Sequence, residues 1–247
     1  MNNEPTHTRR ATRQARHLLI CTPNSCESIM HQLNRITGKQ PIQVLSVCDL
    51  FQSKWLSARQ IWYRMVGSGE SFTHEVPYRS KFPSKASQGK PMGVSVIAFH
   101  RSRACEPERL ILVKQFRIPL LSYVIEFPAG MDDAGETAEQ TAFRELQEET
   151  GFKATRILGS ADGVQFLNPG FCEDDTKLVV VEVDGNDPDN FSPKQQLDSN
   201  ELIDVILVPI NDLMPTLKRF VSEGIQIHAT VYAFAFGYHL SKNMMRF

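Results

Sequence analysis

The stretch GMDDAGETAEQTAFRELQEETGF, residues 130–152, predicts one helix with a defined start and a defined end. Thr137 and Gln140 match a capping box, in which the threonine oxygen accepts a hydrogen bond from the Gln140 backbone and the glutamine side chain reaches back. Gly151 stands where a glycine in the left-handed conformation commonly ends a helix. Apolar residues recur at helical spacing between these ends, so one side of the helix is expected to pack against a sheet.

Three glutamates lie together on a neighbouring side of this predicted helix. Glu145 is followed by Glu148 and Glu149 three and four residues later, and like charges at this spacing destabilise a helix by about 0.2–0.5 kcal/mol per pair. The repulsion grows where the local dielectric constant is low. A hard divalent cation such as Mg²⁺ or Mn²⁺ prefers oxygen ligands and turns the repulsion into attraction. This face therefore predicts a metal site.

The remainder of the chain predicts a layered, mixed α/β core. Apolar runs of strand length are separated by turn-prone or charged segments. They cover residues 93–100, 109–116, 123–130, 177–184 and 202–209, and helical patterns follow at 210–223 and 229–241. Strands before and after one central helix, with more helix at the end, favour this arrangement.

Residues 1–44 differ from the rest and are interpreted as an N-terminal extension. The early part is rich in arginine and poor in acidic residues, which resembles a mitochondrial presequence; a disordered or loosely attached extension is the alternative. Residues 45–90 are interpreted as a small β-rich subdomain, with GSGE at 67–70 as a hairpin turn. Residues 91–247 are expected to form the main domain.

Composition excludes several classes of partner. The net charge is −1, and the early arginines give only a small electrostatic footprint, so nucleic acid is not an expected partner. No apolar run approaches the roughly 20 residues that a membrane span needs. Five scattered cysteines indicate neither a disulfide framework nor a zinc ribbon, which favours a reducing compartment and a cytoplasmic location.

The helix and the residues before it match a known signature, G-x5-E-x7-R-E-U-x-E-E-x-G-U, in which U is a bulky apolar residue. The matching positions are Gly130, Glu136, Arg144, Glu145, Leu146, Glu148, Glu149, Gly151 and Phe152. The chain therefore resembles the Nudix hydrolases and departs from the Nudix box at none of these positions. The resemblance implies a mixed β-sheet between α-helices and hydrolysis of a nucleoside diphosphate linked to another group.

The box also implies roles for its residues. Two or three Mg²⁺ ions, or Mn²⁺, would be held by Glu145, Glu148 and Glu149, with Glu148 and Arg144 also counted among the catalytic residues. Glu136 and Arg144 are expected to form an ion pair that orients the loop and the helix. The structural residues of the motif would be Gly130, Glu136 and Gly151.

The flanking stretch LILVKQFRIPLLSYVIEFPAGMDDAGE resembles the ADP-sugar pyrophosphatase branch, in which V-x-Q-x-R-x-P precedes a strand ending in E-x-P-A-G. This resemblance implies that Arg117 contacts a phosphate or the distal ribose of the substrate. It also implies that Ala129 offers its backbone carbonyl to a metal, that Glu126 lies near the site and that Met131 contacts the substrate.

Two further segments resemble the parts of that family that hold adenine. SKW would make Trp55 a stacking platform, and THEVPYRS would supply Glu75 and Arg79 as substrate contacts. His74 stands where the family has a second stacking tryptophan, so any stacking on it covers less area. Trp62 is interpreted as a packing residue.

A final segment, NELIDVILVP, resembles the family stretch that carries a catalytic base, which would be Glu201. A surface glutamate at a strand edge is the alternative interpretation. The long polar segment 185–200 before it is of a length that is usually functional or disordered, and a lid closing over the substrate would lie there. FLNPGF at 166–171 matches a family loop near the substrate, with Asn168 where aspartate is common.

Taken together, the resemblance, which covers about residues 53–240, implies hydrolysis of ADP-ribose or a related ADP-sugar to AMP and a sugar phosphate. It also implies a homodimer whose N-terminal strands cross to the partner chain. The change at His74 leaves another substrate open: a dinucleoside polyphosphate, coenzyme A, a cap structure or an oxidised nucleotide. A non-catalytic ADP-ribose sensor is the alternative from another class, against which the intact box argues.

Overall fold

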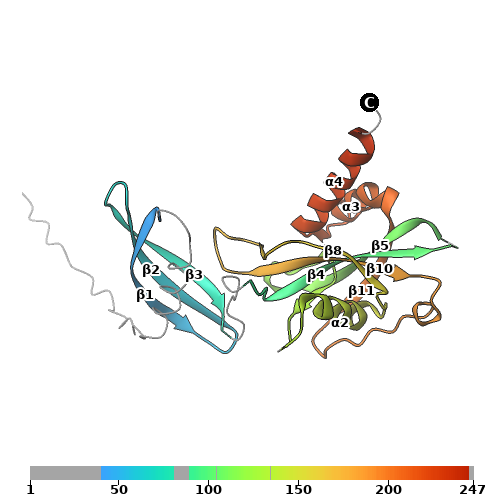
Figure 1. The fold of residues 1–247 in the computed structure, drawn as a ribbon, viewed down its shortest axis with the longest axis horizontal. Helices are drawn as coiled ribbons and strands as arrows, with labels where there is room; N and C mark the ends of the chain where they lie inside the picture. The colour runs from blue at the N-terminus through green and yellow to red at the C-terminus, as the bar shows by residue number, and fades with distance from the viewer. Residues whose placement is uncertain (1–39, 81–88, 104, 134, 245–247) are drawn as a thin grey trace, which may run out of the picture. The chain divides into compact units, whose positions relative to one another are not determined.

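The structure is a computed structural model that describes residues 40–80, 89–103, 105–133 and 135–244. The chain divides into two units, Met1–Ser80 and Lys81–Phe247 (Figure 1). Of the extension predicted over residues 1–44, residues 1–39 lie outside the described part. The first strand already begins at Ile42, so regular structure starts slightly earlier than predicted.

The described part of the first unit is an antiparallel sheet of three strands in the order β1–β2–β3. The strands are β1 (Ile42–Gln52), β2 (Leu56–Met65) and β3 (Ser71–Arg79). The hairpin turn predicted at 67–70 is confirmed, since Gly69 has a φ of 73° and the Met65 N–H donates to the Glu70 carbonyl at 2.8 Å. The β2–β3 pairing has no register shift, so side chains alternate regularly between its two faces.

This sheet buries few of its apolar side chains. Val47 and Cys48 are buried, and Cys48 is disulfide-bonded, which the cysteine spacing did not indicate. The large apolar side chains that stay exposed are Leu45, Leu50, Phe51, Trp55, Leu56, Trp62, Val66 and Phe72. Exposed apolar surface on this scale is typical of interaction sites.

Among the described residues, the second unit contains a mixed sheet of nine strands and the helices α2, α3 and α4. The strands are β4 (Gly93–Ser102), β5 (Cys105–Arg117), β6 (Ser122–Glu126), β7 (Ala129–Met131), β8 (Arg156–Ser160), β9 (Gln165–Phe166), β10 (Asp175–Asp184), β11 (Ile203–Pro209) and β12 (Gln226–Ile227). The helices are α2 (Ala138–Thr150), α3 (Leu213–Ser222) and α4 (Ala229–Met244), with short 3-10 turns η2 (Ile118–Leu120), η3 (Pro188–Asn190) and η4 (Ile210–Asp212). The strands follow the order β12–β6–β5–β4–β10–β8, while β11 pairs with β5, β7 with β4 and β9 with β10.

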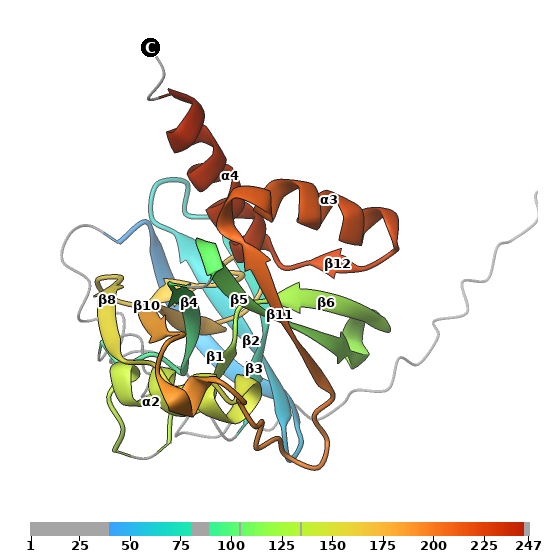
Figure 2. The ribbon, with the colours of Figure 1, turned by 90° about the vertical axis from the view of Figure 1, so that its right-hand side faces the viewer.

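Helices cover both faces of this sheet. Helix α2 lies on one face, and α3 and α4 lie on the other (Figure 2). Consecutive residues of β4 show the two cores, because Val96 belongs to the cluster with Leu146 of α2, whereas Ile97 belongs to the cluster with Leu217 of α3 and Val231 of α4. The predicted fold class, a mixed sheet between helices, is confirmed.

Two predicted elements differ in detail from the structure. The run at 123–130 is not one strand, because it is interrupted at Phe127 and Pro128 between β6 and β7, and proline has no N–H to donate to a sheet. The helix predicted at 210–223 begins with the 3-10 turn η4 before α3. Within the part of the chain that is described, no helix is both long and apolar enough to cross a membrane.

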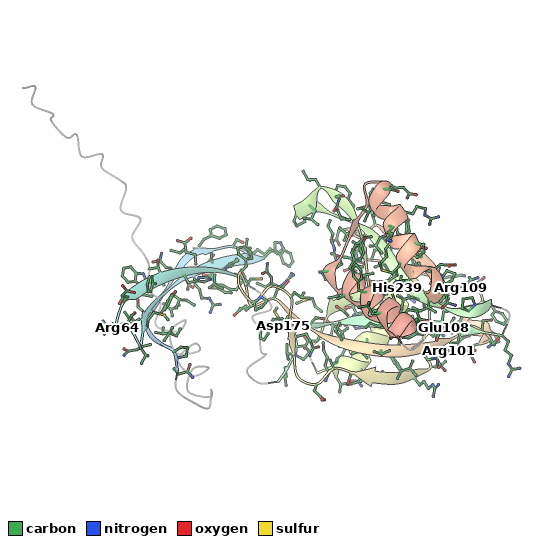
Figure 3. All side chains as sticks on the ribbon, turned by 90° about the horizontal axis from the view of Figure 1, so that it is seen from above. Arg64, Arg101, Glu108, Arg109, Asp175 and His239 are labelled. Atoms are coloured by element: carbon green, nitrogen blue, oxygen red, sulfur yellow. The ribbon has the colours of Figure 1, made fainter. Side chains whose placement is uncertain are left out.

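The two ends of the large sheet carry different chemistry. Arg101 and Glu108 lie at one end and Asp175 at the other (Figure 3). Arg101 pairs with Glu108 and Glu182, which is a surface network of ion pairs. At the Asp175 end, the first residues of β4 pair with β7, so Gly130 of the glutamate-rich motif is found there.

Candidate active site

Helix α2 carries the three glutamates, and both of its ends are capped as predicted. Thr137 Oγ1 accepts a hydrogen bond from the Gln140 N–H at 3.3 Å, and Gln140 Oε1 accepts one from the Thr137 N–H at 2.9 Å. Gly151 has a φ of 75°, and its N–H donates to the Gln147 carbonyl at 2.8 Å. These caps fix where the helix begins and ends, and therefore which direction each glutamate faces.

The Arg144 guanidinium ties the loop before α2 to the helix. It donates to both carboxylate oxygens of Glu136 at 2.9 Å and to the Met131 carbonyl at 2.9 Å. Its Nη1 donates to Glu145 at 2.8 Å and to Glu148 at 2.9 Å. The Arg144 hydrogen bonds lower the pKa of Glu136 to about 2, and they raise the pKa of Arg144 itself.

Glu149 is the carboxylate with the least compensation. It is only 4% exposed, and its Oε2 accepts a hydrogen bond from the Ala129 N–H at 3.0 Å. Burial raises its pKa to about 8, and the nearby charges of Glu145 and Glu201 contribute to the increase. Burial also raises the pKa of Glu145, although Arg144 opposes that change. The site therefore holds more negative charge than its own cations balance.

Gly130 allows the backbone of β7 to approach this face of the helix. A Cβ atom built at position 130 would lie 2.0 Å from the Glu145 carboxylate. Any side chain would therefore displace Glu145. The β7 strand in turn is held by antiparallel pairing, with Gly130 opposite Val94.

Two residues distant in sequence from α2 share its electrostatic environment. Glu201 raises the pKa of both Glu145 and Glu149, while Arg117 lowers the pKa of Glu149. Arg117 ends β5 and Glu201 lies just before β11, and these two strands pair. The candidate base and the candidate phosphate contact therefore reach the same neighbourhood through strand pairing.

Arg117 is held in place by Glu126 of β6. Its Nε donates to Glu126 Oε2 at 2.8 Å, and its Nη2 forms an ion pair with the same oxygen at 2.6 Å. Gln115 Nε2 also donates to that oxygen, at 2.8 Å. Gln115 is the glutamine of the V-x-Q-x-R-x-P motif, but the sequence predicted no role for it. Its spacing of two from Arg117 on a strand puts both side chains on one face, which is the signal that could have identified it.

The segment 185–200, where a lid is predicted, is hydrogen-bonded to the end of α2. The Gln196 N–H donates to the Glu148 carbonyl at 2.8 Å, and Gln195 Nε2 donates to the Glu149 carbonyl at 2.7 Å. Asn190, in η3, is buried. The last carbonyls of a helix have no partner within the helix, and this segment supplies their donors.

The donor atoms of the site suit a divalent metal ion. Among the described residues, no three His, Cys, Asp or Glu side chains are already gathered as metal ligands, and Arg144 draws Glu145 and Glu148 toward itself. The donors within reach are carboxylate and carbonyl oxygens, which Mg²⁺ and Mn²⁺ prefer. A buried carboxylate with a raised pKa, such as Glu149, gains from a cation in place of a proton. The residues of this site are therefore suited to hold Mg²⁺ or Mn²⁺.

The candidate nucleobase residues lie in the first unit. Trp55 lies between β1 and β2 and is 60% exposed, with the Lys54 ammonium 4.7 Å from its ring centroid. His74, Glu75 and Arg79 are exposed residues of β3. His74 and Glu75 are consecutive in a strand, so their side chains lie on opposite faces of the sheet.

Trp62 does not pack in a core, and its interpretation as a packing residue is wrong. Its side chain lies on β2 and is 46% exposed. The indole Nε1 donates to Gln60 Oε1 at 2.7 Å. The apolar neighbours of Trp62 in sequence suggested burial, but the sheet has too few covering side chains to provide it.

The loop at 166–171 begins in β9, which pairs with the start of β10 at Asp175. It therefore lies at the same end of the sheet as β7. Phe166 and Phe171 are exposed there. The backbone N–H of Phe171 donates to the Asn168 carbonyl at 3.0 Å, which closes the turn.

The layered fold and the carboxylate face of α2 are features of a metal-dependent hydrolase. The model of the NUDIX domain family matches residues 89–229, which is more than half of the chain. The chain belongs to the Nudix family and is a Nudix hydrolase. Nudix hydrolases generally depend on divalent metal ions, in keeping with the donor set described above.

Several characterised or assigned proteins are similar to this chain. A Caenorhabditis elegans protein assigned to the nudix hydrolases is 39% identical, covering 89% of each chain. The ADP-sugar pyrophosphatase of Mus musculus is 35% identical, over 77% of this chain and 82% of its own length. The ADP-ribose pyrophosphatase of Saccharomyces cerevisiae is 29% identical, over 92% and 96%. The crystal structure of an ADP compounds hydrolase has the same fold, with a TM-score of 0.55 at 19% identity, over 74% of this chain and 86% of that one.

Proposed function

We propose that this Nudix hydrolase cleaves the pyrophosphate of ADP-ribose or a related ADP-sugar to AMP and a sugar phosphate. The observation that carries the proposal is the buried carboxylate of Glu149. Burial and the charges of Glu145 and Glu201 raise its pKa, and the charge of Arg117 lowers it. Two pyrophosphatase relatives that span most of this chain support the substrate class.

Two or three Mg²⁺ ions, or Mn²⁺, would be held by Glu145, Glu148, Glu149 and the Ala129 carbonyl. When bound, these ions supply positive charge that stabilises the charge developing on the pyrophosphate oxygens. Arg144 would keep its two hydrogen bonds to Glu136, and thereby hold the helix and loop in place while the other carboxylates turn to the metal.

Glu201 would accept the proton of the attacking water, as a general base does. Its charge contributes to the raised pKa of Glu145 and of Glu149, so it acts on the same site. Arg117 would bind a phosphate oxygen through the donors that Glu126 leaves free. The hydrogen bonds from Arg117 and Gln115 to Glu126 support a fixed orientation for that contact.

Residues of the three-stranded sheet would bind the nucleobase: Trp55, His74, Glu75 and Arg79. Met131 would contact the substrate beside the metal ligands. We also propose a homodimer, for which the exposed apolar side chains of this sheet are the physical support. A cytoplasmic location is proposed, with an organelle as the alternative if the arginine-rich start acts as a leader.

The test is a substrate panel of ADP-ribose, ADP-glucose, a dinucleoside polyphosphate and coenzyme A, measured as phosphate release with a coupled phosphatase. Wild type and Glu149→Gln are compared in Mg²⁺. Turnover of ADP-ribose that is lost in the variant supports the proposal. Preference for another panel member would move the substrate class, and tight ADP-ribose binding without turnover would favour a sensor.

A further inference from the structure

The side chain of Gln195 connects the end of helix α2 to the start of β11. Its Nε2 donates to the Glu149 carbonyl at 2.7 Å and to the Ile203 carbonyl at 2.9 Å. A primary amide has two N–H donors, so these hydrogen bonds use both. Glu149 is a candidate metal ligand, and Ile203 follows the candidate base Glu201 by two residues. One side chain therefore links the backbone at the metal ligand to the backbone beside the base.

Other contacts hold the backbone around Gln195 against the same end of α2. The Gln196 N–H donates to the Glu148 carbonyl at 2.8 Å. A Cβ atom at Gly151 would lie 2.3 Å from the Lys194 backbone nitrogen, so the two backbones are in direct contact. In Figure 2 the segment that precedes β11 passes alongside α2. The backbone is therefore anchored on both sides of Gln195, and its side chain starts from a fixed point.

Glu201 itself is held in a turn that begins at Asp198. The Glu201 N–H donates to the Asp198 carbonyl at 3.0 Å, and the Asp198 N–H donates to Glu201 Oε2 at 3.0 Å. This turn lies between Gln195 and Ile203 in sequence, and the hydrogen bond from the Gln195 amide to the Ile203 carbonyl joins the two ends of that stretch. The stretch is thus a closed loop, and the position of Glu201 within it depends on the Gln195 amide.

A cavity of about 380 Å³ lies beside this connection. Its lining comes from α2, from the segment 185–200 and from β11, and it includes Thr150, Pro193 and Val205. Fewer side chains fill this space than fill a close-packed core. The hydrogen bonds of Gln195 therefore carry more of the connection between α2 and β11 than side-chain packing does.

We propose that Gln195 is a positioning residue for the hydrolysis, which holds the base Glu201 in a fixed place relative to the metal ligand Glu149. The inference rests on the proposed function, in which Glu201 accepts the proton of the attacking water. A general base must lie within hydrogen-bond reach of that water, and a displacement of about 1 Å can lower the rate on the order of a hundredfold. Gln195 does not touch the reacting atoms and acts through the two carbonyls that it binds.

The kinetic test replaces the amide while keeping the length of the side chain. Gln195→Met removes both donors, Gln195→Lys keeps donors at the tip, and Gln196→Met is the matched control, because Gln196 donates to α2 through its backbone. We expect Gln195→Met to lower kcat on the order of tenfold, with KM within about twofold of wild type. Gln195→Lys should recover most of kcat, and Gln196→Met should stay within about twofold. An unchanged kcat in Gln195→Met, or an equal loss in Gln196→Met, overturns the assignment.

A double-mutant comparison separates positioning of the base from a general structural effect. If Gln195 acts through Glu201, Gln195→Met should change kcat by less than about twofold once Glu201→Gln has removed the base. A loss on the order of tenfold in that background as well overturns the inference. Glu201→Gln with the kcat of wild type refutes the proposed base and the inference with it, whereas an impaired Glu201→Gln beside an unaffected Gln195→Met refutes the inference alone.

Hydrogen exchange tests the connection without turnover. In Gln195→Met the Glu201 N–H should exchange about fivefold faster than in wild type or more, because the closed loop has lost its hydrogen bonds. The Thr141 N–H, which donates to the Thr137 carbonyl in the first turn of α2, is the internal reference and should exchange at the same rate in both proteins. Equal exchange at Glu201 in the two proteins, or equally faster exchange at both amides, overturns the inference.

Discussion

Replacement of Glu149 by glutamine is expected to stabilise the metal-free protein at high pH. Glu149 is 4% exposed, and burial raises its pKa from 4.5 to about 8. Between these two values the folded protein retains a proton that the unfolded chain has lost. The contribution of this group to the free energy of unfolding therefore falls as the pH rises through that window, and it is lowest above pH 8.

The size of the effect follows from the two pKa values. Each tenfold change in proton affinity corresponds to about 1.4 kcal/mol, so an ionised Glu149 costs the folded protein on the order of 5 kcal/mol at high pH. Rearrangement of nearby side chains and entry of water reduce this cost. We expect Glu149→Gln to be more stable than wild type by about 2 kcal/mol or more at pH 9, and by less than about 1 kcal/mol at pH 5.

The assay is urea unfolding with a chelator present, at pH 5 and pH 9, for wild type, Glu149→Gln and the exposed control Glu223→Gln. The control should show no comparable dependence on pH. Addition of Mg²⁺ at pH 9 should stabilise wild type more than Glu149→Gln, because the variant lacks one negative ligand. The reasoning would be refuted if the free energies of unfolding of wild type and Glu149→Gln differed by the same amount at both pH values. It would also be refuted if wild type were more stable than Glu149→Gln at pH 9.

Three further substitutions test other contacts. Gly130→Ala would place a Cβ 2.0 Å from the Glu145 carboxylate, so kcat/KM should fall by on the order of a hundredfold or more while thermal melting changes little. Gly151→Ala adds a Cβ at a φ of 75° and 2.3 Å from the Lys194 backbone nitrogen, and it should lower the free energy of unfolding by about 2 kcal/mol or more in urea titrations. Glu201→Gln should lower kcat by about 10²–10⁴-fold, while calorimetry should find Mg²⁺ binding of similar affinity; a loss of binding instead would assign Glu201 to the metal.

The parts of the fold that depend on local chemistry could be predicted from the sequence. The caps of α2 use side chains within a few residues of the ends they satisfy, so Thr137 and Gly151 were identifiable without tertiary information. The strands of the large sheet are apolar runs because helices cover both faces. The break between β6 and β7 is harder to see, since Phe127 continues the apolar run and only Pro128 signals the interruption.

The parts that depend on long-range contacts were not predictable. The segment 185–200 is held by hydrogen bonds from Gln195 and Gln196 to carbonyls at the end of α2. The sequence of this polar segment does not indicate which element it contacts. Similarly, the β2–β3 register decides that Trp62 shares a face of the sheet with Glu75. A shift of one residue would have put it on the face of His74.

The crowding of glutamates on α2 is costly for a second reason besides their mutual repulsion. Glu148 and Glu149 occupy the last turn of the helix, where the macrodipole and the unpaired carbonyls are negative and acidic side chains are unfavourable. The protein compensates in part, since Gln195 and Gln196 donate to the carbonyls of these two glutamates and Arg144 pairs with Glu148. Among the described residues Glu149 has one backbone donor and no paired cation, and burial raises its pKa to about 8. A divalent ion at this face would remove the remaining cost, so the same feature that weakens the metal-free fold gives the metal its affinity.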